Sequence, residues 1–169
     1  MPGAMWNLGA VLFKAFVINI SYQQRLLYIR LSNITAMTIP EFLEQQAAER
    51  QPLMNAIHEA IMANDKTVQP VIEPMMGKEM IIYKEQGKVM KYGLASVKNY
   101  MSIHCLPMYM NPPLFNKFVA SMPNAKFQKG CVNFVDASEM PIAAVAQLVI
   151  DCSGISILAL LEARNKKKK

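Results

Sequence analysis

One uninterrupted block of sequence, Tyr92 to Phe134, does most to limit the folds open to this chain. Its apolar residues recur first with the two-residue period of strands, then with the 3.6-residue period of a helix, and then again with the strand period. Turn-forming residues stand where the period changes. The block therefore predicts two consecutive strands, a short helix and a further strand. Because 53% of the 169 residues are hydrophobic and 18% are charged, such elements can enclose a core, and a disordered chain is excluded.

The segments on either side of this block supply the other expected elements. We expect helices over residues 38–50, 52–64 and 114–122, strands over 79–84, 88–97, 100–105 and 131–135, and a helix that begins after 136–139 and reaches about 149. Residues 68–74 are expected to be irregular because Pro70 and Pro74 interrupt them. This order predicts an α+β fold, with an antiparallel sheet of about four strands and helices packed on one face. The other face of such a sheet is expected to be open.

The chain divides into three parts by composition. Thr38, Pro40 and Glu41 have the spacing of a helix start with a capping box, so the domain is expected to span 37–154. Residues 1–36 contain no acidic residue and are interpreted as an accessory leader or an upstream extension of the reading frame. Its apolar run is short and interrupted, so no stable membrane insertion is expected, and weak membrane association is the alternative. Residues 155–169 are expected to form a helix that can dock onto the body, followed by a lysine tail.

The positive charge of the chain lies mainly at its ends. The formal net charge is +6, but the excess sits in the termini, chiefly in Lys166 to Lys169, and the folded body is close to neutral. A nucleic-acid-binding function is therefore not favoured. Within the body, residues 74–130 carry eight basic and two acidic residues. This segment is either a docking face for an anion or an acidic partner, or a row of solvated lysines along the sheet.

The sulfur-containing residues indicate a reducing compartment. Cys105, Cys131 and Cys152 are an odd number, widely spaced and without a C-x-x-C motif, which argues against a disulfide framework and a zinc site. Together with 14 methionines, they are typical of soft core residues in a cytoplasmic protein. The predicted location is the cytoplasm.

Side-chain alternation along residues 100–105 predicts which face of the sheet is buried. Met101, Ile103 and Cys105 point to one side, which we expect to be the core, and Tyr100, Ser102 and His104 point to the other. An open face with aromatic and basic side chains can bind a small ligand or a protein partner. The alternative is that the tyrosines are half buried and His104 forms only local hydrogen bonds. The predicted ligand-binding residues are Tyr92, Lys98, Tyr100, His104 and Lys129.

No catalytic set is visible in the sequence. There is no G-x-S-x-G motif, and neither histidine has an acidic residue at a suggestive spacing. Cys131 follows Lys129 and Gly130, and a lysine that leaned toward the thiol would lower its pKa. The plainer interpretation is that Cys131 opens a core-facing strand as a small hydrophobic residue. The sequence therefore predicts a protein that is not an enzyme.

Three short motifs in the block carry a resemblance to a known family: Lys98-Asn99-Tyr100, Ser102-Ile103-His104 and Gln128-Lys129-Gly130-Cys131. From about residue 37 to about residue 151 the chain resembles the YdhG-like family, a small bacterial α/β domain. Some of its members are described as frataxin-like iron chaperones. The resemblance implies a two-layer, frataxin-like architecture and a role in iron binding or delivery.

An iron site would need clustered oxygen ligands. Glu41 and Glu44, spaced i and i+3 on the first expected helix, are the candidate residues. Two functions thus stay open after the sequence is read. One is an iron-binding or iron-delivery module, and the other is a ligand- or protein-binding module that uses the open face of the sheet.

Overall fold

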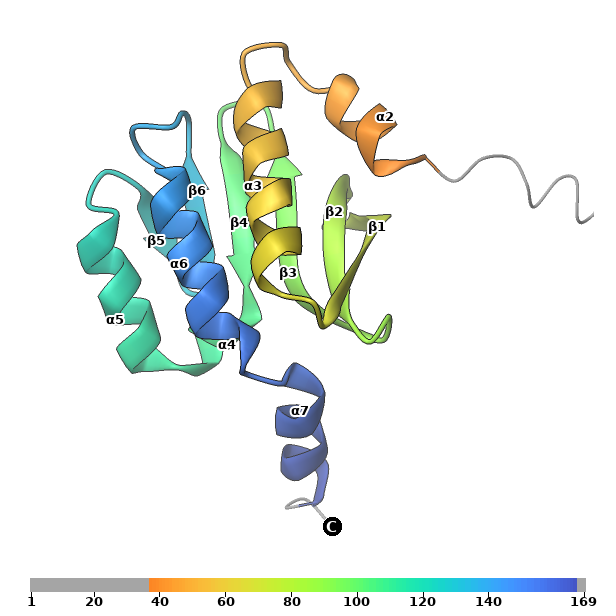
Figure 1. Ribbon diagram of the computed structural model, residues 1–169, viewed down its shortest axis with the longest axis vertical. Coiled ribbons are helices and arrows are strands. Elements are labelled where there is room, and N and C mark those ends of the chain that lie inside the picture. Colours follow the sequence, from red (N-terminus) through yellow and green to blue (C-terminus); the bar gives the residue numbers. More distant parts are fainter. Residues whose placement is uncertain (1–36, 167–169) are drawn as a thin grey trace, which may run out of the picture. The chain divides into compact units, whose positions relative to one another are not determined.

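The computed structural model describes residues 37–166. They form an α+β fold around one sheet of six antiparallel strands, in the order β1-β2-β3-β4-β6-β5 (Figure 1). The strands are β1 (Val68–Met75), β2 (Lys78–Glu85), β3 (Val89–Ser96), β4 (Met101–Cys105), β5 (Lys126–Gln128) and β6 (Cys131–Phe134). The helices are α2 (Ile39–Glu44), α3 (Gln51–Asn64), α4 (Leu106–Met110), α5 (Pro112–Ser121), α6 (Ile142–Ser153) and α7 (Ile157–Lys166).

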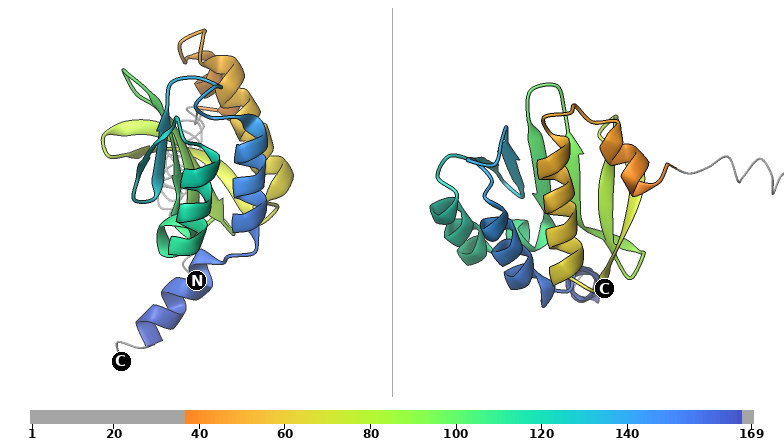
Figure 2. Two further views of the ribbon diagram at one scale, coloured as in Figure 1. Left: turned by 90° about the vertical axis from the view of Figure 1, so that its left-hand side faces the viewer. Right: turned by 45° about the horizontal axis from the view of Figure 1, so that its top comes forward.

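The helices α3, α5 and α6 lie on one face of the sheet (Figures 1 and 2). The core fills the space between these two layers, with Ile57 from α3, Leu148 from α6 and Leu94 and Ile103 from the central strands all buried. No helix covers the opposite face within the part of the chain that the structure describes (Figure 2). The α+β class, the antiparallel sheet and the one-sided helical layer are as the sequence predicts.

The sheet has six strands, and the prediction of about four was wrong. The two strands that sequence reasoning missed, β1 and β5, are the two edges of the sheet. Pro70 and Pro74 made β1 look irregular, but an edge strand tolerates proline because the missing N–H faces away from the neighbouring strand. Strand β5 has only three residues, too few to show an alternating pattern.

The β2–β3 hairpin has a regular turn and an irregular register. Gln86 and Gly87 both have positive φ angles, 50° and 68°, as a tight hairpin turn requires. Tyr83 pairs with Tyr92, but the next residue of β2, Lys84, pairs with Met90, so that Lys91 is the extra residue of a β-bulge. Consecutive strand residues normally point to opposite faces, and this bulge allows Lys91 and Tyr92 to reach the same buried carboxylate, that of Asp65.

Several helix boundaries differ from expectation. The capping box at Thr38 and Glu41 is confirmed, but α2 ends at Glu44 rather than at residue 50. Helix α6 begins at Ile142, and Asp136 instead accepts hydrogen bonds within a separate turn before it. The C-terminal helix α7 is held to the body at its start, where Glu85 of β2 accepts hydrogen bonds from the Ile157 and Leu158 backbone N–H groups. In α7 only Ile157 is buried, and the rest of the helix extends from the core (Figure 2).

By length and hydropathy, no single helix within residues 37–166 qualifies as a membrane span. Helices α6 and α7 pass that test only as a pair, and they are bent by 41° at the break between them. The predicted leader, residues 1–36, lies outside the described residues, as do the last three lysines of the tail.

Candidate functional site on the open face of the sheet

A hollow of about 300 Å³ opens on the helix-free face, above the centre of the sheet. Side chains from β2, β3, β4 and β6 form its floor because every second residue of each strand faces this side. Methionine side chains and Ala95 line one part of the hollow, and polar side chains line the other. The lining includes Met75, Met76, Lys78, Met80, Ala95, Val97, Tyr100, Ser102, His104, Gln128, Cys131 and Asn133.

A thiol and an imidazole lie in contact within this hollow. His104 on β4 is directly opposite Cys131 on β6, and Cys131 Sγ lies 3.0 Å from His104 Nδ1. Burial raises the pKa of the Cys131 thiol, and the nearby Cys105 raises it further. Burial also lowers the pKa of the His104 imidazole. Both shifts favour a neutral thiol and a neutral imidazole over a thiolate–imidazolium pair.

Ser102 gives the hollow an unpaired hydroxyl. Its side chain is on the same face as His104, two residues away on β4, and only 4% of the residue is exposed. Of the buried polar side-chain atoms in the described part of the chain, Ser102 Oγ alone has no hydrogen-bond partner. Its cross-strand neighbours are Ala95, which has no polar side chain, and Asn133. A buried hydroxyl usually has a partner, so this atom is a natural attachment point for a ligand.

A second hollow, of about 350 Å³, adjoins the first at the β5–β6 side. The two hollows share the side chains of Tyr100, Gln128 and Asn133, so they are neighbours on the open face, and we refer to them together as the groove. The second part is more polar, and its lining includes Asn99, Lys126 and Glu139. Tyr100 is 39% exposed and offers a flat aromatic surface in the groove.

The open face holds some of the predicted site residues but not all of them. Tyr100 and His104 line the groove, and the Met101, Ile103 and Cys105 side is buried as predicted. Lys98 and Lys129 lie in exposed turns beside the sheet and do not line either hollow. The backbone oxygen of Lys98 accepts a hydrogen bond from Arg50, which fixes the turn rather than the lysine side chain.

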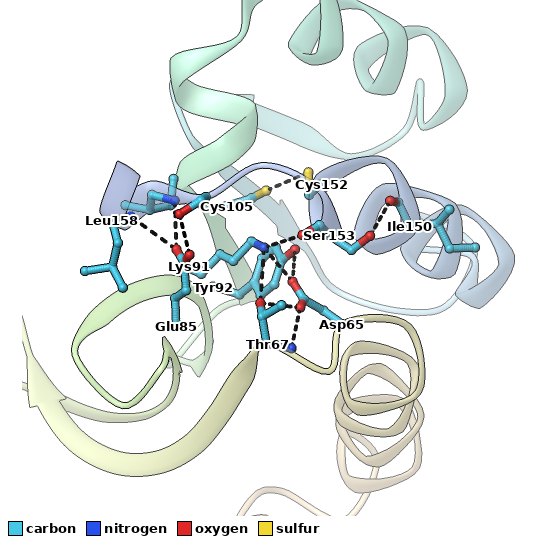
Figure 3. A network of polar contacts seen from close by, with 12 residues as sticks. Asp65, Thr67, Glu85, Lys91, Tyr92, Cys105, Ile150, Cys152, Ser153 and Leu158 are labelled. Atoms are coloured by element: carbon cyan, nitrogen blue, oxygen red, sulfur yellow. Dashed lines mark hydrogen bonds and ion pairs between the residues drawn. The ribbon is translucent and has the colours of Figure 1, made fainter. Parts of the chain in front are cut away.

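The expectation that Tyr92 shares the open face was wrong. Its ring lies on the helix-covered side with 1% of the residue exposed, and its hydroxyl donates to Asp65 Oδ2 at 2.9 Å (Figure 3). The bulged Lys91 reaches the same carboxylate, at 2.8 Å, and also donates to the Ser153 carbonyl. Tyr83, which pairs with Tyr92 on the neighbouring strand, is likewise buried in the core, and its hydroxyl contacts the His58 imidazole. These residues tie the sheet to α3 and α6, and they are not accessible to a ligand.

The acidic candidates for iron do not converge. The Glu41 carboxylate accepts hydrogen bonds from the Thr38 backbone and hydroxyl at 2.8 Å, and these bonds lower its pKa. Glu44, at the end of α2, is exposed. Among residues 37–166, no group of three or more histidine, cysteine, aspartate or glutamate side chains is placed to hold a metal ion.

Sequence reasoning missed part of the groove. Cys131 was interpreted as facing the core, but it faces the open side, and Asn133 and the methionines were not considered. The sequence did contain a signal for the orientation of Cys131. In β6 the apolar residues Val132 and Phe134 alternate with Cys131 and Asn133, which predicts that Val132 and Phe134 face the core and Cys131 faces the open side. The sequence contained no signal for the contact of Cys131 with His104, because the register between β4 and β6 depends on a long connection.

The comparisons with known proteins bear on none of these features. No protein-family model, no curated protein and no solved structure matches the chain. The resemblance to the YdhG-like family therefore stays a prediction, and the groove on the open face is the feature from which a function can be inferred.

Proposed function

We propose that the protein is a ligand-binding module and that its ligand lies in the groove on the open face of the sheet. The observation that carries this proposal is the unpaired hydroxyl of Ser102 at the floor of the groove. Leaving a buried polar group unpaired costs about 1–3 kcal/mol. A ligand atom that forms a hydrogen bond with Ser102 Oγ recovers this cost. The position of the hydroxyl is already fixed because Ser102 lies within strand β4.

The lining of the groove indicates what kind of ligand fits. The hollow around Ser102, at about 300 Å³, matches the lower end of the size range of small-ligand sites. Methionine side chains adapt to irregular shapes, and Tyr100 offers an aromatic surface. The polar groups at the floor then orient the ligand. The lining of the Ser102 hollow includes one basic residue, Lys78, and no acidic residue, so it has no carboxylate that could pair with an organic cation.

The proposal is non-enzymatic. The neutral Cys131–His104 pair lacks the low thiol pKa that nucleophilic cysteines need. The role in iron binding or delivery implied by the family resemblance also stays a prediction. It has no support from a ligand cluster among the described residues, and Glu41 already serves the start of α2.

The test is a screen of the full chain by thermal shift against small organic molecules, anions and metal ions. A specific ligand at a hundredfold excess over Kd stabilises the protein by about 2.7 kcal/mol. We expect Ser102→Ala and the double change Tyr100→Ala with His104→Ala to leave the protein folded and to abolish the shift. Ser121→Ala, on the far side of the sheet in α5, is the matched control. A ligand whose shift survives all the groove substitutions contradicts the proposal.

A further inference from the structure

We propose that the ligand of this groove is a soft monovalent metal ion, Cu(I), held by the Cys131 thiolate and the His104 imidazole with a methionine thioether beside them. This inference rests on the proposed function, because it names the ligand class of the same site. The metal replaces the thiol proton, which is released to solvent, so that binding involves no change of oxidation state.

The two strong ligands are already aimed at each other. Cys131 Sγ and His104 Nδ1 are 3.0 Å apart and belong to directly paired residues on neighbouring strands. With metal–ligand bonds as long as those of zinc, about 2.3 Å to sulfur and about 2.0 Å to nitrogen, and a ligand–metal–ligand angle of about 110–120°, the two ligand atoms need a separation of about 3.5–3.7 Å. Opening the pair by roughly half an ångström requires only small rotations of the two side chains, which face the open space of the hollow.

Gly93 brings methionine side chains to the same place. It pairs with His104 on the third strand of this row, and it has no side chain to fill the space above it. A methyl group placed there would lie 3.5 Å from His104 Cβ, 3.5 Å from Met80 Sδ and 2.9 Å from Met90 Cε. Met80 Sδ and His104 Cβ therefore lie near each other beside Gly93, and the side chains of Met80, His104 and Cys131 all line the same hollow.

The number and type of these ligands select Cu(I) over other metals. Structural zinc sites almost always use four ligands, and no group of three suitable side chains exists in the described residues. Iron(II), magnesium and calcium favour oxygen ligands, and the Ser102 hollow has no carboxylate in its lining. Thiolate and thioether sulfur are the ligands that Cu(I) prefers, and imidazole also binds copper. As a d¹⁰ ion, Cu(I) also binds three ligands in a trigonal arrangement, which a thiolate, an imidazole and a thioether can supply.

The rim of the hollow carries a methionine that packing does not explain. Met76 is 83% exposed, lies in the β1–β2 turn and has a positive φ angle of 52°, which is unfavourable for a residue with a side chain. It lines the hollow together with Met75 and Met80. An exposed thioether at the mouth of a site with a thiolate and an imidazole at its floor offers Cu(I) a soft first contact from solvent.

The test is a Cu(I) titration of the reduced full chain under anaerobic conditions, in competition with a chelator whose Cu(I) complex is coloured. We expect one Cu(I) per chain, near-ultraviolet absorption from thiolate–Cu(I) charge transfer, and no comparable uptake of Zn(II) or Fe(II). Because the metal displaces a proton, the apparent affinity should rise about tenfold per pH unit below the thiol pKa. Loss of about a hundredfold in affinity is expected for Cys131→Ser and for His104→Gln, and about tenfold for Met80→Leu.

The control is Cys152→Ala, which removes a thiol that is buried on the helix-covered side, 3.6 Å from Cys105. Its Cu(I) affinity should equal that of the unmodified chain. Unchanged affinity in Cys131→Ser, or loss of affinity in Cys152→Ala instead, overturns the inference. If the chain binds no Cu(I) but an organic ligand or anion gives a thermal shift that Ser102→Ala abolishes, the inference fails while the proposed function stands. If no compound or metal ion gives a thermal shift that the groove substitutions reduce, both the Cu(I) inference and the proposed function are overturned.

Discussion

Lys91 Nζ lies 2.8 Å from Asp65 Oδ2, and neither side chain has more than 1% of its surface exposed. The pair is possible because the bulge in β3 turns Lys91 to the same side as Tyr92, whose hydroxyl donates to the same carboxylate (Figure 3). Burial alone raises the pKa of Asp65, but hydrogen bonds from Lys91, Thr67 and Tyr92 outweigh this effect and leave the pKa below its usual value. The carboxylate is therefore charged at neutral pH and needs its partners.

Removing one partner of this pair should destabilise the protein strongly. Lys91→Met leaves the Asp65 carboxylate buried without its cation, and we expect a loss of about 3–5 kcal/mol in the free energy of unfolding. Urea denaturation followed by circular dichroism measures it. Lys88→Met, at an exposed position of the same hairpin, is the control and should change stability by less than about 0.5 kcal/mol. Equal effects of the two substitutions would contradict the buried pair.

The two sides of β4 should differ in their tolerance of truncation. Ile103 is 1% exposed and lies in the main core, so Ile103→Ala should cost about 2–5 kcal/mol. Ser102→Ala removes a hydroxyl that has no partner, so its effect should be within about 0.5 kcal/mol of zero or slightly stabilising. Equilibrium unfolding of both variants checks the register, and reversed costs would exclude it.

Gly130 should not tolerate a side chain. A methyl group at this position would lie 2.6 Å from Tyr109 Cβ and 3.2 Å from the Cys105 carbonyl oxygen, neither of which can move freely. We expect Gly130→Ala to lower stability by about 1–3 kcal/mol. Gly154→Ala is the matched control, because nothing lies within 4 Å of the added methyl group and the φ angle is −74°. That variant should be unchanged or more stable by about 0.4–1 kcal/mol.

The two histidines should make the protein sensitive to mild acid. Burial lowers the pKa of both His58 and His104 below 6.5, whereas the unfolded chain keeps the ordinary value. The unfolded state thus binds more protons, and stability that is fully present above about pH 6.5 is lost as the pH falls toward the folded-state pKa. The melting temperature should fall between about pH 7 and about pH 5.5, and fall less in His104→Gln. An identical pH dependence in that variant would rule out a contribution from His104.

Helix α7 should depend on a single side chain from the β2–β3 hairpin. Glu85 accepts hydrogen bonds from the Ile157 and Leu158 backbone N–H groups and from the Ser156 hydroxyl, and so caps the start of α7 (Figure 3). In Glu85→Ala we expect faster amide hydrogen exchange over residues 157–166 and unchanged exchange in β4. Glu79→Ala, an exposed position on β2, should leave both segments unchanged. Protection of α7 that persists in Glu85→Ala would show that the cap is dispensable.

The central part of the fold can be predicted from local sequence, whereas the elements that were not predicted depend on tertiary pairing. The alternation in β4 and the turn at Gly87 are properties of neighbouring residues, so both could be predicted. Strand β1 could not, because Pro70 is compatible with a strand only at an edge, and position in the sheet is not a local property. The contact between Lys91 and Asp65 needs a bulge whose cause lies in the packing around it.

The same distinction applies to the candidate site. Tyr100 and His104 could be placed on one face because they lie on one strand. The position of Cys131 beside His104 follows from the pairing of β4 with β6. Tyr92 does not belong to the site, because the register of β3 places it opposite Cys105 on the buried side. Side chains from different strands meet through the register, and a single sequence contains little information about it.

The prolines of β1 have a consequence for the behaviour of the protein at high concentration. An uncovered edge strand is a template on which a second molecule can add a strand, and long exposed edges promote aggregation. Pro70 and Pro74 remove two backbone donors from one end of this sheet, and the three-residue β5, which carries Lys126, is too short to recruit a strand at the other. Both edges therefore disfavour growth of the sheet from molecule to molecule, although one of its faces carries no helix among the described residues.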